Sequence, residues 1–93
     1  MTKFAKAIDM MNNADQFVGM VIGATVRGCG SQWVKLLDIN EKGDKVQFTV
    51  KMLTHNAHVG IKKVTVAKDK RVSFQEAEVF IKWCKSIGVE ANY

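Results

Sequence analysis

Residues 45–52 read Lys-Val-Gln-Phe-Thr-Val-Lys-Met, and polar and apolar side chains alternate without a break. Successive side chains of a β-strand point to opposite faces, so the alternation predicts a strand with one buried and one wet side. Antiparallel sheets commonly have one face on the core and one in water. The fold must therefore contain a sheet that is covered on the side of Val46 and open on the side of Lys45.

Three further strands are predicted from alternating or β-branched residues. Glycines at positions 19 and 23 mark a bend or a close approach within the first of them. The chain contains no proline, so its turns are expected at glycines and at clusters of charge. The three strands are Phe17–Val26, Gln32–Asn40 and Ile61–Ala67.

Both ends of the chain predict helices. Phe4, Ile8 and Met11 recur at helical spacing after Thr2. A second helix is expected to begin at Ser73, because a glutamate three residues later completes a capping-box pattern. This helix should stop at Gly88 and bury Trp83.

These elements predict a two-layer α+β fold, with an antiparallel four-stranded sheet and both helices on one face, in the order α-β-β-β-β-α. With 93 residues, 47% apolar and 25% charged, the chain should form one compact domain over residues 1–93. No apolar stretch reaches the roughly 20 residues of a membrane span, and no signal peptide is evident. We expect a soluble cytoplasmic protein.

The positive charge of the chain is concentrated in one segment. Basic and acidic groups balance over residues 1–44, whereas residues 45–71 carry seven basic groups and Asp69 as their one acid, in a chain of net charge +5. A localised positive surface attracts polyanions, of which a phosphate backbone is the commonest. The alternative is an ordinary solvated lysine-rich face.

An open sheet face with lysines predicts binding of nucleic acid, with RNA or single strands preferred. Ammonium groups suit backbone phosphates, whereas base reading favours the geometry of Arg, Asn or Gln, so recognition of shape and backbone is expected. A flat ring can stack on unpaired bases. The residues predicted to contact nucleic acid are Lys45, Lys51, Lys62, Lys63, Lys70, Arg71, Trp33 and His58.

Catalysis is not predicted. His55 and His58 could bind a metal or act in acid–base chemistry, but no further ligands have supporting spacing, and Cys29 and Cys84 lie 55 positions apart. We therefore expect no metal, no cofactor and no enzymatic activity, and a role as a small regulator or inhibitor, monomeric or homodimeric. The alternative is a module that places its basic face against an acidic protein partner.

Overall fold

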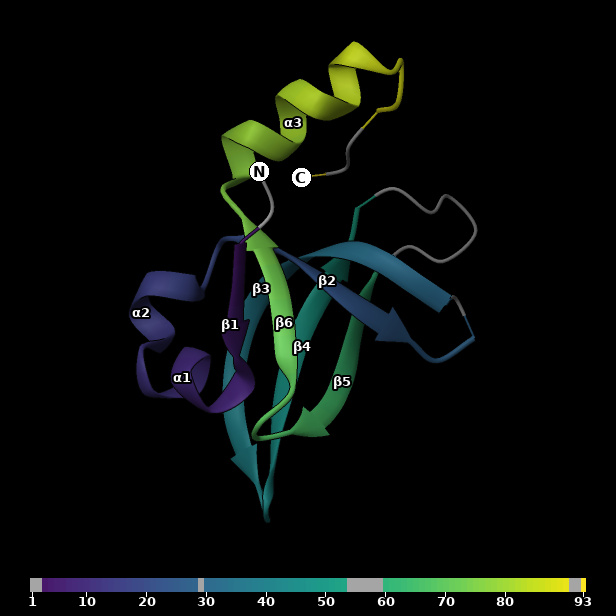
Figure 1. Cartoon of the computed structure of the whole chain (residues 1–93). Helices are drawn as coiled ribbons and strands as arrows, with labels where there is room; N and C mark the ends of the chain where they lie inside the picture. The colour runs from purple at the N-terminus through teal and green to yellow at the C-terminus, as the bar shows by residue number, and fades with distance from the viewer. Residues whose placement is uncertain (1–2, 29, 54–59, 91–92) are drawn as a thin grey trace.

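The computed structural model describes residues 3–28, 30–53, 60–90 and 93. Within these residues it contains one antiparallel sheet of six strands and three helices (Figure 1). The predicted α+β class with an antiparallel sheet is confirmed, whereas the predicted count of four strands is wrong. The elements are β1 (Lys3–Lys6), α1 (Ala7–Asn12), α2 (Ala14–Phe17), β2 (Val21–Val26), β3 (Gly30–Lys42), β4 (Lys45–Met52), β5 (Ile61–Ala67), β6 (Arg71–Gln75) and α3 (Ala77–Ser86).

The sheet has the strand order β1-β6-β2-β3-β4-β5. Strands β2 to β5 form a meander, and β6 then returns to lie between β1 and β2. In Figure 1, β1 and β6 lie in front of β3 and β4, so the sheet curls around its interior. The register of β3 against β4 shifts between Leu36 and Asp38. An extra residue in one strand bends it and increases its twist, which favours this curl.

The concave side of the sheet holds the main core. Five strands contribute buried side chains to it, including Ile22, Leu36, Phe48, Val64 and Val72. Helix α1 closes the core with Ala7 and Met10, both fully buried. The alternation predicted for β4 is confirmed, since Val46, Phe48, Val50 and Met52 are all buried and their neighbours are not.

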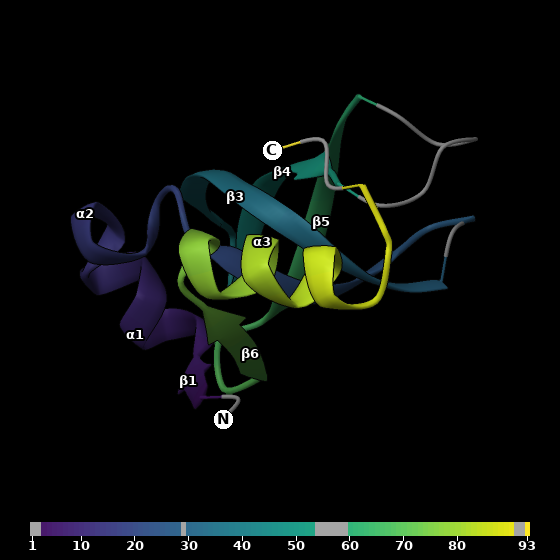
Figure 2. The same ribbon diagram turned by 90° about the horizontal axis from the view of Figure 1, so that it is seen from above.

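A second, smaller core lies on the convex side. Phe80 and Cys84 of α3 pack there with Val21 of β2 and Leu53, and Trp33 is partly buried against them. Val21 and Ile22 are adjacent in one strand and so point to opposite sides of the sheet. Helices α1 and α3 therefore cover opposite sides, and the prediction that both lie on one face is wrong. Figure 2 shows α3 across one end of the sheet, and Figure 1 shows α3 above the sheet with α1 and α2 lower on its left side.

The N-terminal helix begins later than predicted, because Lys3–Lys6 pair with β6 as a strand. Spacing of four residues, as between Phe4 and Ile8, keeps side chains on one side of either a helix or a strand, so the pattern alone could not exclude a strand. The first amides of α1 are satisfied across the chain: Ala7 N donates to Lys70 O and Ile8 N to Lys68 O, both at 2.9 Å. These bonds tie α1 to the turn between β5 and β6.

The strand predicted at Phe17–Val26 is shorter than expected. Residues Ala14–Phe17 form α2, and β2 begins at Val21 after Gly19, whose φ of 97° favours glycine. Phe17 packs edge-on against Phe74 of β6, with ring centroids 5.1 Å apart. This contact between distant segments explains why the local alternation around Phe17 does not produce a strand.

The C-terminal helix starts at Ala77 and not at Ser73, so the capping-box prediction is wrong. Ser73 lies within β6, and Glu76 flanks the helix without a side-chain cap. The predicted stop is confirmed: Gly88 has a φ of 76°, and its amide and that of Val89 bond back to Lys85 O and Cys84 O. Trp83, predicted to be core, is 47% exposed. None of the helices in the described residues is long and apolar enough to cross a membrane.

Candidate nucleic-acid interface

The convex side of β3, β4 and β5 carries the predicted wet face. In β4, Val46, Phe48 and Val50 are buried in the core. Lys45 and Lys51 occupy the alternate positions of the strand and therefore point away from the core. Lys63 of β5 lies opposite Thr49 and shares this side, whereas Lys62 lies opposite the buried Val50. We call the set Lys35, Lys45, Lys51 and Lys63 the lysine face.

Lys35 joins this face through the irregularity in β3. Pairing counted from the hairpin at Lys42 and Lys45 would put Lys35 opposite Met52 on the core side, but the shift after Asp38 places it opposite Lys51. Lys35 was not among the residues predicted to bind. An extra residue in a strand moves the side chains beyond it to the opposite face of the sheet. The sequence around residues 36–38 gives no clear sign of such a bulge.

Four ammonium groups on neighbouring strands give this face a positive field. Lys35 and Lys51 are direct cross-strand neighbours, an arrangement that destabilises a sheet when the charges are alike. Among the described residues, the one ion pair joins Lys68 Nζ to Glu41 Oε2 at 3.1 Å, outside the lysine face. Within the described residues no acidic side chain pairs with the lysine face, which fits a surface that receives an anion.

Tyr93 brings an aromatic ring to the same place. The ammonium of Lys35 lies 4.1 Å from the centroid of the Tyr93 ring, and Lys51 Nζ donates to the Tyr93 carbonyl oxygen at 3.3 Å. The Tyr93 hydroxyl donates to the carbonyl of Gly19. The ring remains 36% exposed. Nothing in the sequence pattern pointed to Tyr93, because its position depends on contacts far along the chain.

The remaining predicted residues do not join the lysine face. Trp33 does share its side of β3 with Lys35, but its ring packs near Phe80 of α3, with centroids 6.3 Å apart. Lys62 points to the other side of β5, and His58 lies outside the described residues. Lys70, in the turn before β6, and Arg71, the first residue of β6, lie beside a separate groove.

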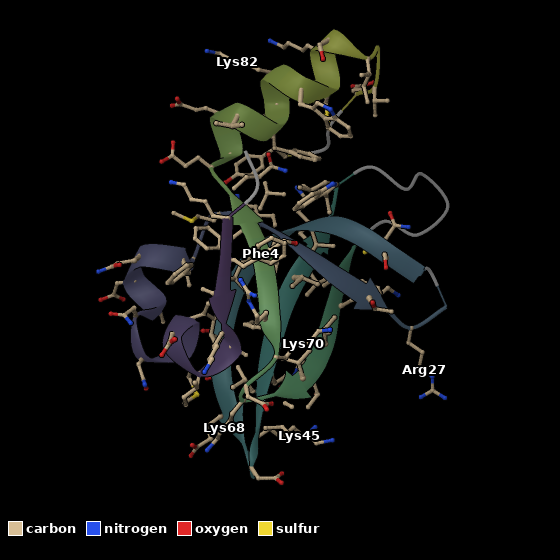
Figure 3. All side chains as sticks on the ribbon, in the orientation of Figure 1. Phe4, Arg27, Lys45, Lys68, Lys70 and Lys82 are labelled. Carbon is tan, nitrogen blue, oxygen red and sulfur yellow. The ribbon has the colours of Figure 1, made fainter. Side chains whose placement is uncertain are left out.

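This seam groove lies where the curled sheet fails to close, between β5 on one side and β2 and β6 on the other. Its volume is about 660 Å³, and none of the described residues that line it is acidic. Phe48, Val64 and Val72 give it apolar walls, while Lys70 and Arg71 stand at its rim. The guanidinium of Arg71 lies 5.3 Å from the centroid of the Phe4 ring, which is 53% exposed. Figure 3 shows Phe4 and Lys70 toward the front of this region.

The Cys, Asp and Glu side chains of the described residues are the candidates for metal binding. No three His, Cys, Asp or Glu side chains gather there as a metal site would need. Cys84 is buried beneath α3, and this burial raises the pKa of its thiol, so it stays protonated and unreactive at neutral pH. Both histidines lie outside the described part of the chain.

Comparison with known proteins identifies no relative: no family model, curated protein or solved structure matches the chain. The functional conclusion therefore depends on the residues of the lysine face and the seam groove themselves.

Proposed function

We propose that the protein binds single-stranded nucleic acid, RNA or DNA, by placing the phosphate backbone against the lysine face. The observation that carries the proposal is the presence of four outward lysines on three adjacent strands, none of them paired with an Asp or Glu side chain among the described residues. Ammonium groups are compact point charges that suit phosphates and carry little base specificity. Recognition is then of backbone and shape.

The dimensions of the lysine face suit a short run of nucleotides. Lys45 and Lys51 are six residues apart in one strand, which corresponds to about 20 Å. Proteins that hold single strands along a basic groove or sheet commonly cover about 4 to 16 nucleotides. A ligand lying along β4 would pass both lysines, with Lys63 on one neighbouring strand and Lys35 on the other.

The Tyr93 ring supports a preference for single strands over duplexes. Unpaired bases can stack on an exposed aromatic ring, whereas the bases of a duplex are already stacked on one another. Tyr93 lies between the two cross-strand lysines that would hold phosphates. The protein would act in the cytoplasm by occupying its ligand, as a regulator or inhibitor, and not by turnover.

The experiment is a binding titration by fluorescence anisotropy. Labelled oligo-uridine, oligo-deoxythymidine and duplex DNA of about 12 nucleotides are compared, over roughly 50 to 200 mM salt. Four phosphate contacts predict a log–log salt slope of about −3 for the single strands. The duplex should bind more weakly than either single strand.

Two double variants that change the net charge equally serve as the test and its control. Lys45→Glu with Lys51→Glu reverses two members of the lysine face and should weaken single-strand binding by more than about tenfold, with a slope of about −1.4. Arg27→Glu with Lys82→Glu reverses two exposed cations elsewhere, on the β2–β3 hairpin and on α3 (Figure 3). This control should stay within about threefold of the parent protein. Equal losses in both variants, or no binding of any oligomer at low salt, would reject the proposal, and the latter would favour an acidic protein partner.

A further inference from the structure

The seam groove is bordered by strand edges that have no partner within the described chain. β5 is the last strand of the sheet and pairs with β4 alone. On β6, Arg71, Val72 and Ser73 pair on the side of β1, while the pairing of β6 with β2 covers Phe74 and Gln75. Backbone N–H and C=O groups along an edge strand are able to pair with an added strand.

The connection between β5 and β6 keeps these two edges near one another. Residues 68–70 alone separate the strands, and Lys70 N donates to Ala67 O at 3.1 Å across that turn. The turn is fixed further by the bonds from the first amides of α1. The two strands leave the turn as in a hairpin but do not pair with each other. The turn that separates the two strands is therefore fixed by backbone bonds, and the groove lies between the strands that leave it.

The residues that line the groove determine which side chains an entering strand would need. On the core side of β5, the neighbours of an added strand are Val64 and Val66, next to Phe48 and Val72. On the outer side they include Lys63 and Thr65, with Arg71 and Lys70 at the rim. Since side chains of a strand alternate, an entering strand would present apolar residues inward and acidic residues outward.

We propose that the seam groove binds an extended peptide with alternating apolar and acidic residues, which adds to the sheet beside β5. Its apolar side chains enter the groove beside Val66, above the floor formed by the buried Phe48, Val64 and Val72, and its carboxylates face Lys63 and Arg71. A second copy of this chain is disfavoured, because pairing two β5 edges would place four ammonium groups, Lys62 and Lys63 of each copy, along one short seam. This binding does not depend on nucleic-acid binding, although Lys63 borders both the groove and the lysine face.

The test uses the peptide Val-Glu-Val-Glu-Val-Glu-Val as the probe, with a peptide of the same composition but with its glutamates in one block as the control. Binding is followed by anisotropy, and amide hydrogen exchange of residues 61–67 is followed by NMR. At a free peptide concentration about ten times Kd, alternate amides of β5 should exchange about tenfold more slowly. The block peptide should bind more weakly and protect none of them.

Variants separate this site from the lysine face. Arg71→Glu should weaken binding of the alternating peptide by about fivefold while leaving single-strand nucleic-acid binding nearly unchanged. Lys45→Glu with Lys51→Glu should do the reverse. The milder Arg71→Gln should give a smaller loss in the same direction, which guards against a folding defect in Arg71→Glu.

Several results would overturn the proposal. These are absence of peptide binding, binding without protection of β5 amides, equal binding of the block peptide, and self-association through β5 in sedimentation. A single-stranded oligomer that displaces the peptide and protects the same amides would also reject it, because the groove would then belong to nucleic acid. Apart from displacement by the oligomer, none of these results bears on whether the lysine face holds phosphates.

Discussion

The convex side of the sheet is divided into two halves with opposite properties. Over β2 and the start of β3, Val21 and Trp33 face outward and α3 covers them with Phe80. Over β4 and β5 the outward residues are mainly lysines, threonines and a glutamine, with Ile61 and Ala67 at the two ends of β5, and none of the described helices packs on them. Lys35 and Trp33 are two residues apart on one strand, and the boundary passes between them.

The difference shows that a few outward side chains decide which part of a sheet becomes core and which stays a surface. Burying Val21 and much of Trp33 stabilises the docking of α3, because apolar area is removed from water. Covering the lysines would require removing their charges from water without partners, at a large cost in free energy. The lysine half therefore stays in contact with water and is not covered by a described helix.

The largest effect is expected from removing the ring that covers the apolar half. Phe80→Ala should lower the free energy of unfolding by about 3 kcal/mol, since the ring is fully buried and a cavity would remain. Urea denaturation measures the loss. Trp83→Ala, on the same helix but 47% exposed, is the matched control and should cost far less. Equal effects would mean that α3 does not dock through Phe80.

A smaller effect is expected where the covered half is crowded at Gly23. A Cβ added at Gly23 would overlap the Oγ of Ser73, while the Trp33 ring lies in ordinary contact distance. Gly23→Ala should therefore lower stability by about 1 kcal/mol. Adding Ser73→Ala should restore most of the loss, and a double-mutant cycle by urea denaturation measures this coupling. Purely additive losses would contradict the close approach.

The open half should instead accept a larger side chain and gain function from it. Gln47 lies on β4 between Lys45 and Lys51 in the outward direction. Gln47→Lys should strengthen single-strand binding by about threefold and steepen the salt slope by about 0.7. Anisotropy titration checks both values, and Gln16→Lys, exposed on α2, provides a control with the same charge change. A gain of equal size in that control would indicate net charge and not the lysine face.

The smallest effect concerns pH and the buried thiol under α3. Because burial raises the pKa of Cys84, the folded state holds its proton at pH values where the unfolded thiol has lost it. The stabilising contribution is complete below the unfolded pKa, about 8.5, and falls as the pH rises above it. Urea denaturation at neutral and alkaline pH should show a steeper decline for the parent than for Cys84→Ala. Parallel declines would contradict this.

The predictions from the sequence were most accurate for elements whose structure is determined by a local sequence pattern. Strands β4 and β5 have the predicted bounds, because alternation continued through each strand and one face was wet. Gly88 was correctly predicted as the helix stop, since its positive φ is a local requirement. Local patterns failed at β1 and β6, whose strand form depends on pairing between residues 3–6 and 71–74.

The residues of the lysine face were likewise predicted where a local pattern fixes their direction and missed where it depends on distant contacts. Lys45, Lys51 and Lys63 share a face as expected, because period-two alternation fixes their direction. Lys35 was missed, since its direction depends on the shifted register near Leu36, and Tyr93 was missed because it reaches β3 and β4 from the far end of the chain. Trp33 was assigned to the correct side of β3, but only the docking of α3 reveals that this part of the side is covered.

The most direct test of the divided convex side is to map a single-stranded oligomer onto it by amide NMR of the isotopically labelled protein. We predict that titration with oligo-uridine shifts the amides around Lys35, Lys45, Lys51 and Lys63, and leaves those of Val21, Phe80 and Cys84 unchanged. Shifts concentrated on α3, or spread evenly over every exposed cation including Arg27 and Lys82, would contradict the assignment of the lysine face as the binding surface.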